Sequence, residues 1–123
     1  MDFQGMFKEK REHTRFRTLA VAELSYSDYP EILDRGVIID ISMGGMAFTS
    51  TRTFNIGDCL SILVPSRALN IIGKVKRIKE DEKYFMYGLE FNSNLESVKM
   101  RLSKWISQIY RLIICSSKNK STG

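Results

Sequence analysis

Two short clusters of polar residues in this sequence have the chemistry to bind an anionic nucleotide. The first is an Arg-x-x-x-Arg pair, Arg11 and Arg15, in a basic segment near the N-terminus. A guanidinium group is a planar fork that binds phosphate oxygens through two hydrogen bonds and also stacks on a base. The same fork reaches the O6/N7 edge of guanine. The pair is therefore a candidate site for phosphate and guanine.

The second cluster is an Asp-x-Ser-x-x-Gly sequence, formed by Asp40, Ser42 and Gly45 at the end of an apolar run. A carboxylate accepts hydrogen bonds from the N–H groups on the Watson–Crick edge of guanine, and a hydroxyl donates or accepts. Gly44 and Gly45 permit a positive φ, and their bare backbone lets a ligand approach closely. This cluster predicts a turn that holds a base.

Each cluster has an ordinary explanation when it stands alone. Paired arginines in a basic segment are usually solvated, and Asp-x-Ser before two glycines is a common turn. Together, in this order and with a strand-like run between them, they resemble the PilZ domain, a small bacterial β-barrel family that typically binds cyclic di-GMP. The sequence Tyr-Gly-Leu-Glu-Phe at residues 87–91 also resembles the family's closing strand, so the resemblance covers about residues 8–114.

The resemblance implies a receptor for cyclic di-GMP that performs no catalysis. In the family, the arginine segment wraps the ligand against the Asp-x-Ser-x-x-Gly turn. Arg11 and Arg15 would then bind phosphate and guanine, while Asp40, Ser42 and Gly45 would hold the base from the barrel side. No cofactor and no metal are expected besides this ligand.

Two further residues are possible accessory contacts. Lys10 precedes the first arginine, and in the family this position influences whether one ligand or a stacked pair binds. Gly44 lies inside the turn. The leader is expected to be flexible over residues 1–17. The resemblance also implies that the ligand orders residues 8–17 of it and so changes the surface presented to a bacterial protein partner.

The hydrophobic pattern after the leader predicts a small all-β domain over residues 18–92. Short runs of alternating or β-branched residues are separated by turn sequences at the spacing of a six-stranded antiparallel barrel. The expected strands are Thr18–Tyr26, Val37–Ile41, Met46–Ser50, Cys59–Val64, Ala68–Ile78 and Tyr84–Phe91.

The pattern then changes to helical spacing, which predicts a helix over residues 94–114 that caps the barrel. Asn94 is the expected N-cap residue. A polar, disordered tail is expected over residues 116–123. The apolar stripe that must be covered is Leu95, Val98, Leu102, Trp105, Ile106, Ile109 and Ile113.

Size and composition indicate one globular domain and argue against several kinds of protein. The chain has 123 residues, of which 43% are apolar, and we find neither a membrane-spanning run nor a secretion signal. Cys59 and Cys115 lack the spacing of metal ligands, as expected for reduced thiols in a cytoplasmic protein. The single histidine, His13, has no partners for a metal site or a catalytic triad. We therefore expect no enzyme.

Two alternatives remain open. The net charge of +5 also suits a small nucleic-acid-binding barrel, with a basic strand carrying Lys74, Lys76, Arg77 and Lys79. A solvated strand face explains those residues more simply. The other alternative is a PilZ-like adaptor that binds proteins and has weak or no affinity for the ligand, although both ligand motifs are present here.

Overall fold

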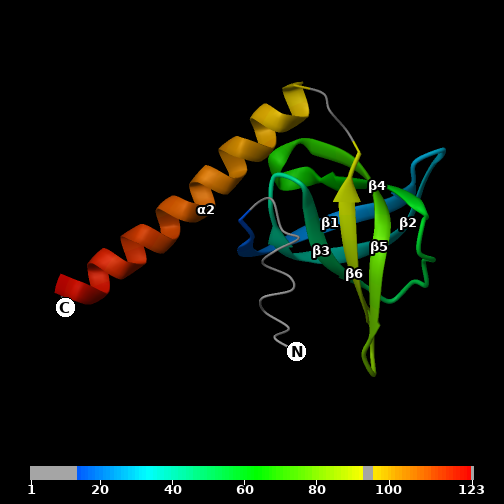
Figure 1. Ribbon diagram of the computed structural model, residues 1–123, viewed down its shortest axis with the longest axis horizontal. Helices are drawn as coiled ribbons and strands as arrows, with labels where there is room; N and C mark the ends of the chain where they lie inside the picture. Colours follow the sequence, from blue (N-terminus) through cyan, green and yellow to red (C-terminus); the bar gives the residue numbers. More distant parts are fainter. Residues whose placement is uncertain (1–13, 93–95, 123) are drawn as a thin grey trace, which may run out of the picture.

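The computed structural model of the chain describes residues 14–92 and 96–122, with side chains described except those of residue 30 and residues 114–122. Six strands, one short 3-10 turn and one long helix follow one another along the chain (Figure 1). They are β1 (Phe16–Tyr26), β2 (Tyr29–Ile41), β3 (Gly45–Ser50), β4 (Cys59–Val64), η1 (Pro65–Arg67), β5 (Leu69–Glu80), β6 (Phe85–Phe91) and α2 (Glu96–Thr122).

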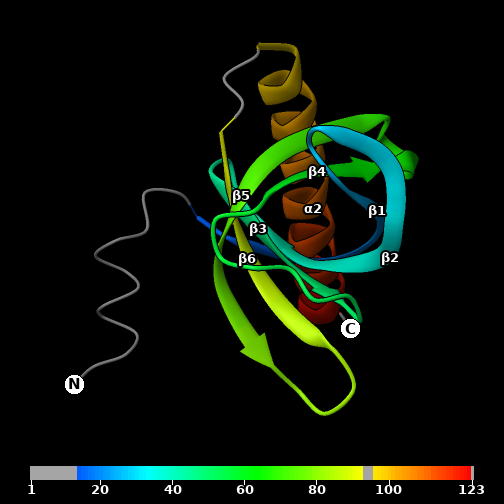
Figure 2. The ribbon, with the colours of Figure 1, turned by 90° about the vertical axis from the view of Figure 1, so that its right-hand side faces the viewer.

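The six strands form a closed antiparallel barrel in the order β1-β2-β3-β6-β5-β4. Closure pairs every strand on both sides, and the predicted all-β barrel with a C-terminal helix is confirmed. The join between β1 and β4 is short, since only residues 23–26 of β1 pair with β4. The hairpin of β5 and β6 extends beyond the barrel (Figures 1 and 2).

The inward side chains of the strands make one apolar core. Phe48 and Tyr87, from the paired strands β3 and β6, stack with ring centroids 5.3 Å apart. Phe54 contacts Tyr87 edge-on at 5.4 Å, and all three side chains are almost completely buried. Because aromatic side chains bury large areas, this cluster contributes strongly to the stability of the barrel.

Helix α2 packs against the barrel through its middle turns. Leu102, Trp105 and Ile109 are buried at the predicted spacing, and the helix contacts β1 and β5. The predicted burial is wrong at Ile113, which is 50% exposed, because the C-terminal turns extend past the barrel (Figure 1). Leu95 and the expected N-cap Asn94 lie outside the described residues.

Several predicted boundaries differ from the structure, among them those of β1, β2 and α2. β1 begins at Phe16, within the segment expected to be leader. β2 begins at Tyr29 rather than Val37, since Gly36 does not end a strand but allows close packing: a Cβ there would lie 2.3 Å from the carbonyl oxygen of Thr49. α2 continues to Thr122, because the polar tail contains no proline and no glycine before the last residue.

Candidate ligand-binding site

The structure brings together one residue from each predicted cluster. Arg15 lies just before β1, and Asp40 is near the end of β2. Arg17 pairs with Asp40 in the register of the two strands, which carries Arg15 to the same edge. The Nη1 atom of Arg15 is 3.7 Å from Oδ1 of Asp40, and the side chains are 19% and 25% exposed. The two therefore form a half-buried ion pair.

Asp40 faces outward because β2 contains a bulge. Ile38 is fully buried in the core, and strict alternation would direct Asp40 inward as well. The pairing with β3 shifts by one residue between Ile38 and Asp40, which reverses this alternation. The pairing with β1 shifts at the same level, between Arg17 and Ala20. The bulge therefore keeps the carboxylate of Asp40 out of the barrel interior, where an unpaired charge would strongly destabilise the fold.

One oxygen of Asp40 has an unused capacity to accept hydrogen bonds. Oδ1 is buried and has no hydrogen-bond partner among the described residues, because Arg15 at 3.7 Å is too far away for one. Buried polar atoms usually have a partner. An N–H donor of a ligand would satisfy this oxygen, and the positive charge of Arg15 lies beside it.

Ser42 holds the turn that follows Asp40. Its buried hydroxyl oxygen accepts the backbone N–H groups of Gly44 at 3.2 Å and Gly45 at 3.1 Å. The hydroxyl also donates to the carbonyl oxygen of Gly45 at 3.2 Å. Ser42 is therefore used within the turn itself. Its predicted contact with a ligand stays a prediction.

Gly45 is needed for a reason that its sequence motif does not reveal. Neither glycine of the turn uses the positive φ that glycine permits, because Gly57 is the only glycine with a positive φ in the described part of the chain. A Cβ at Gly45 would instead lie 2.4 Å from the carbonyl oxygen of Leu89 on β6. Gly44 accepts the N–H of Phe91 at 2.9 Å. The turn is fastened to the end of β6.

A row of residues runs from this ion pair across the outer face of five strands. The register pairs Arg17 with Asp40, Asp40 with Ala47, Ala47 with Gly88 and Gly88 with Arg77. The middle of the row is made of small residues, and Ala47 is only 8% exposed. Backbones of neighbouring strands are about 4.8 Å apart, so the row spans roughly 19 Å.

Arg77 occupies the far end of the row because of another bulge. Val75 faces the core, and the register shifts between Val75 and Arg77, which turns Arg77 outward opposite Gly88. A Cβ at Gly88 would lie 2.9 Å from Nε and 3.1 Å from Nη2 of Arg77. From the sequence alone, Arg77 is predicted to belong to a solvated basic strand. A bulge leaves no signal in the alternation of one strand, so its position was missed.

The other predicted residues divide into two groups. Arg11 and Lys10, together with His13, lie outside the described residues. Lys74 and Lys76, which were considered for nucleic-acid binding, are exposed on β5 next to Glu90 of β6. Lys74 pairs with Glu90 in the register, and the Nζ atom of Lys76 is 3.9 Å from Oε1 of Glu90. This acidic neighbour offsets part of the positive charge that a nucleic acid would need.

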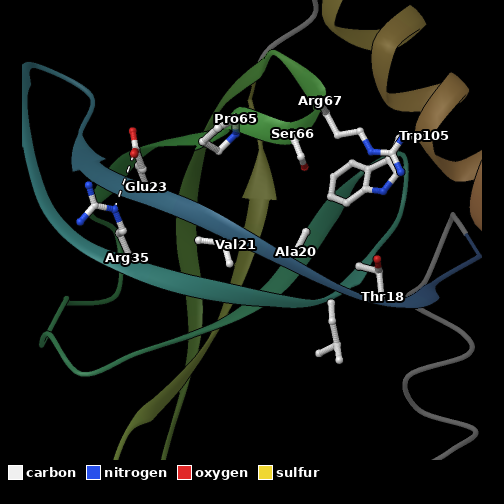
Figure 3. A pocket seen from close by; sticks show the side chains of 10 residues that line it. Thr18, Ala20, Val21, Glu23, Arg35, Pro65, Ser66, Arg67 and Trp105 are labelled. Carbon is white, nitrogen blue, oxygen red and sulfur yellow. Dashed lines mark ion pairs between the residues drawn. The ribbon is translucent and has the colours of Figure 1, made fainter.

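A hollow of about 500 Å³ lies elsewhere on the molecule, between β1, η1 and α2 (Figure 3). Arg67 crosses its rim, where its guanidinium lies 5.6 Å from the ring centroid of Trp105 and donates to Gln108. The opposite wall comes from residues 18–21 of β1. Asp40 and the turn after it do not line this hollow. The described residues of the candidate site therefore lie apart from this hollow.

Within the residues that the structure describes, no group of three histidine, cysteine, aspartate or glutamate side chains is arranged to hold a metal ion. Cys59 is a free, half-buried thiol, and the side chain of Cys115 is not described. The described helix does not have the length of apolar sequence that crossing a bilayer requires.

The family model of the PilZ domain matches residues 9–108 of the chain. No curated protein matches the sequence significantly.

Solved structures share the fold at low sequence identity. The PilZ domain of YcgR from Escherichia coli, with c-di-GMP, aligns with a TM-score of 0.68 and 15% identity over 89% of this chain and 98% of that domain. The K. pneumonia MrkH–c-di-GMP complex aligns with a TM-score of 0.65 and 21% identity, over 89% of this chain and 55% of MrkH. The Bacillus subtilis Inhibitor of motility (MotI/DgrA) aligns with a TM-score of 0.60 and 22% identity, over 78% of this chain and 48% of that chain. The chain thus spans about half the length of the last two proteins.

Proposed function

Since the chain belongs to the PilZ domain family, we propose that it is a receptor for cyclic di-GMP that transmits the signal without catalysis. One observation on this chain carries the proposal. Asp40 holds a buried carboxylate oxygen without a hydrogen-bond partner among the described residues, next to the guanidinium of Arg15. An acceptor for guanine N–H groups thus adjoins a cation suited to phosphate or to the guanine O6/N7 edge.

In this proposal each motif residue has a separate task. Arg15, with Arg11 from the same motif, binds phosphate and guanine. Asp40 accepts hydrogen bonds from the Watson–Crick edge of the base. Ser42 and Gly45 keep the turn in the shape that brings Asp40 and the exposed backbone to the ligand, which the hydrogen bonds within the turn support. Lys10 and Gly44 are accessory contacts.

The signal is proposed to leave the domain through its leader. Residues 8–17 carry both arginines, so a ligand held by them and by Asp40 fixes the leader against the barrel. The ordered leader then presents a new surface to a downstream protein. Because β1 already pairs Phe16 and Arg17 with β2, amide exchange should slow across residues 8–15 when cyclic di-GMP is added, and much less across Val37–Ile39 inside β2. Equal protection of both segments before the ligand is added would contradict this route.

The binding step is tested by calorimetric titration with cyclic di-GMP, using cyclic di-AMP and GTP as controls. Saturable binding of cyclic di-GMP alone supports the proposal, because both the two-nucleotide ring and the guanine edges are then required. If none of the three binds, the chain is an adaptor and the receptor function is wrong. Affinity that instead rises with the length of an oligonucleotide and falls steeply with salt would indicate a nucleic-acid-binding barrel.

The roles of Arg15 and Asp40 are tested together. Arg15→Ala should weaken binding by about ten- to a hundredfold, the usual cost of a lost charge-assisted contact, and Arg15→Lys should rescue poorly. The matched control is Arg35→Ala, since Arg35 is 68% exposed and pairs with Glu23 away from the site. In a double-mutant cycle with Asp40→Ala, the combined loss should be smaller than the sum of the single losses. Strictly additive losses would mean that the two residues do not share one guanine.

A further inference from the structure

Arg77 on β5 points out of the barrel, as Asp40 does, and paired residues link the two positions, although neither sequence motif includes Arg77. Gly88 and Ala47 separate the two residues in the strand register. The three strand spacings between their backbones amount to about 14 Å. The guanidinium of Arg77 lies over Gly88, one strand nearer to Asp40. Two small residues, Ala47 and Gly88, therefore separate the cation of Arg77 from the ion pair of Arg15 and Asp40; we call these two residues the floor.

Two bulges produce this arrangement. The pairing of β2 with β3 shifts after Ile38, and without this shift Asp40 would face the core. The pairing of β5 with β6 shifts after Val75, and without it Arg77 would also face the core. Bulges re-aim side chains and are common beside functional sites. Here they turn an acceptor and a cation to the outside of the barrel, at positions linked by the strand register. Between them, β3 contributes Ala47 and β6 contributes Gly88. These small side chains leave room for a flat ligand to lie against the two strands.

We propose that Arg77 is a further contact for cyclic di-GMP, binding the half of the ligand that extends from Asp40 across Ala47 and Gly88. This inference rests on the proposed function. A cyclic dinucleotide has two purines and two phosphates on one ring, so a base held at Asp40 leaves a second nucleotide unit to be bound. Arg77 offers that unit a fork for phosphate oxygens and a planar group for stacking. The glycine at position 88 is what leaves room for this side chain.

The neighbouring lysines of β5 do not lie opposite Gly88, as Arg77 does. Lys76 is 3.9 Å from Glu90, and Lys74 lies opposite that carboxylate in the strand register. Lys79 pairs with Met86, farther along the hairpin. Arg77 is the cation of this strand that pairs with Gly88. A contact made by Arg77 is therefore separable by mutation from the general positive charge of β5.

The first test compares Arg77→Ala with Lys79→Ala by calorimetric titration of cyclic di-GMP into the full chain. Both residues are exposed cations of the same strand, so both variants lose one charge and should melt like the wild type. Arg77→Ala should weaken binding about tenfold or more, and Lys79→Ala by less than about threefold. Equal affinities of the wild type and Arg77→Ala would overturn the inference. So would equal losses in the two variants, which indicate a general charge effect.

Gly88→Ala provides a second, independent test. The added methyl group would meet only the Arg77 side chain among its nearest neighbours, so it should displace the guanidinium with little cost in stability. Binding should weaken in Gly88→Ala, while the double variant with Arg77→Ala should bind no more weakly than Arg77→Ala alone. A further loss in the double variant, as large as in the wild-type background, would show that Gly88 acts without Arg77.

The two proposals fail in distinguishable ways. If the wild-type chain does not bind cyclic di-GMP, the proposed function is wrong and the role of Arg77 is wrong with it. If the wild type binds and Arg15→Ala weakens binding while Arg77→Ala does not, only the role of Arg77 is wrong. The ligand would then be held by the motif residues without reaching β5.

Discussion

Gly45 lies so close to β6 that a Cβ at this position would be 2.4 Å from the backbone carbonyl oxygen of Leu89. The two strands are paired here, with Gly45 opposite Glu90 and Met46 opposite Leu89. A carbonyl oxygen within a paired strand cannot move away as a flexible side chain can. The last residue of the Asp-x-Ser-x-x-Gly sequence is therefore required by packing, before any contact with a ligand is considered.

Gly45→Ala should destabilise the barrel by about 1–3 kcal/mol, because β3 and β6 must separate to accommodate the methyl group. Urea denaturation measures this change. Gly88→Ala is the control, since its methyl group would meet the movable side chain of Arg77 rather than backbone. If the two variants were equally stable, the close approach of Gly45 to Leu89 would not require glycine at position 45.

Trp105→Ala should destabilise the protein by about 3–5 kcal/mol, because it removes the largest side chain that α2 packs against the barrel. Trp105 is 2% exposed and has the guanidinium of Arg67 beside its ring. The neighbouring Lys104 is exposed, so Lys104→Ala should change the melting temperature little. A Trp105 variant that melts like the wild type would mean that α2 does not contribute to the fold.

Tyr87→Phe should cost about 1–3 kcal/mol even though the ring remains, because two backbone groups lose their partners. The phenol oxygen accepts the N–H of Phe54 at 2.9 Å, and its hydroxyl donates to the carbonyl oxygen of Arg52 at 2.7 Å. Chemical denaturation measures the loss. Tyr26→Phe is a suitable comparison, as Tyr26 is only half-buried. Unchanged stability of Tyr87→Phe would show that water satisfies both groups.

Asp34 should make stability depend on pH in the acid range. Burial raises the pKa of this carboxyl, but hydrogen bonds from Ser50 and from the backbone and hydroxyl of Thr51 outweigh it, so the pKa is lowered from 3.8. Because the pKa is lower in the folded state than in the unfolded state, the ionised carboxylate stabilises the fold fully above about pH 4. This contribution is lost as the pH falls through the pKa of the folded state.

Asp34→Asn should therefore cost about 1 kcal/mol at neutral pH and should flatten the dependence of the melting temperature on pH below about pH 4. Asp28→Asn, in the exposed turn between β1 and β2, is the matched control. If the melting temperature of Asp34→Asn falls with decreasing pH as it does in the wild type, other carboxyl groups cause the pH dependence.

The sequence alone was sufficient to predict the barrel and its helix. Strands β3 and β4 were predicted at nearly their observed bounds, because alternating apolar residues and turns such as Asn55–Asp58 are local features. The helical spacing of Leu102, Trp105 and Ile109 predicted the face of α2 that packs on the barrel. Local patterns are reliable here because each depends on side chains only a few residues apart.

The candidate site was only partly accessible from the sequence. The motif spacing selected Arg15 and Asp40 as partners, and the structure brings them to 3.7 Å. The hydrogen bonds of Ser42 within the turn fit the common turn that the sequence also allowed. The contact of Gly45 with Leu89 was missed, since it depends on a strand far along the chain. The position of Arg77 was missed as well.

Tertiary structure decided which side chains share the outer face. By alternation within its own strand, Asp40 belongs with the buried Ile38, and Arg77 belongs with the buried Val75. Both face outward because the pairing of β2 with β3, and of β5 with β6, shifts by one residue. Such a shift is set by how two strands fit together across the barrel, with hydrogen bonds and side chains of both strands contributing. The residues of one strand determine that it is a strand, whereas its partners determine where a bulge turns its side chains.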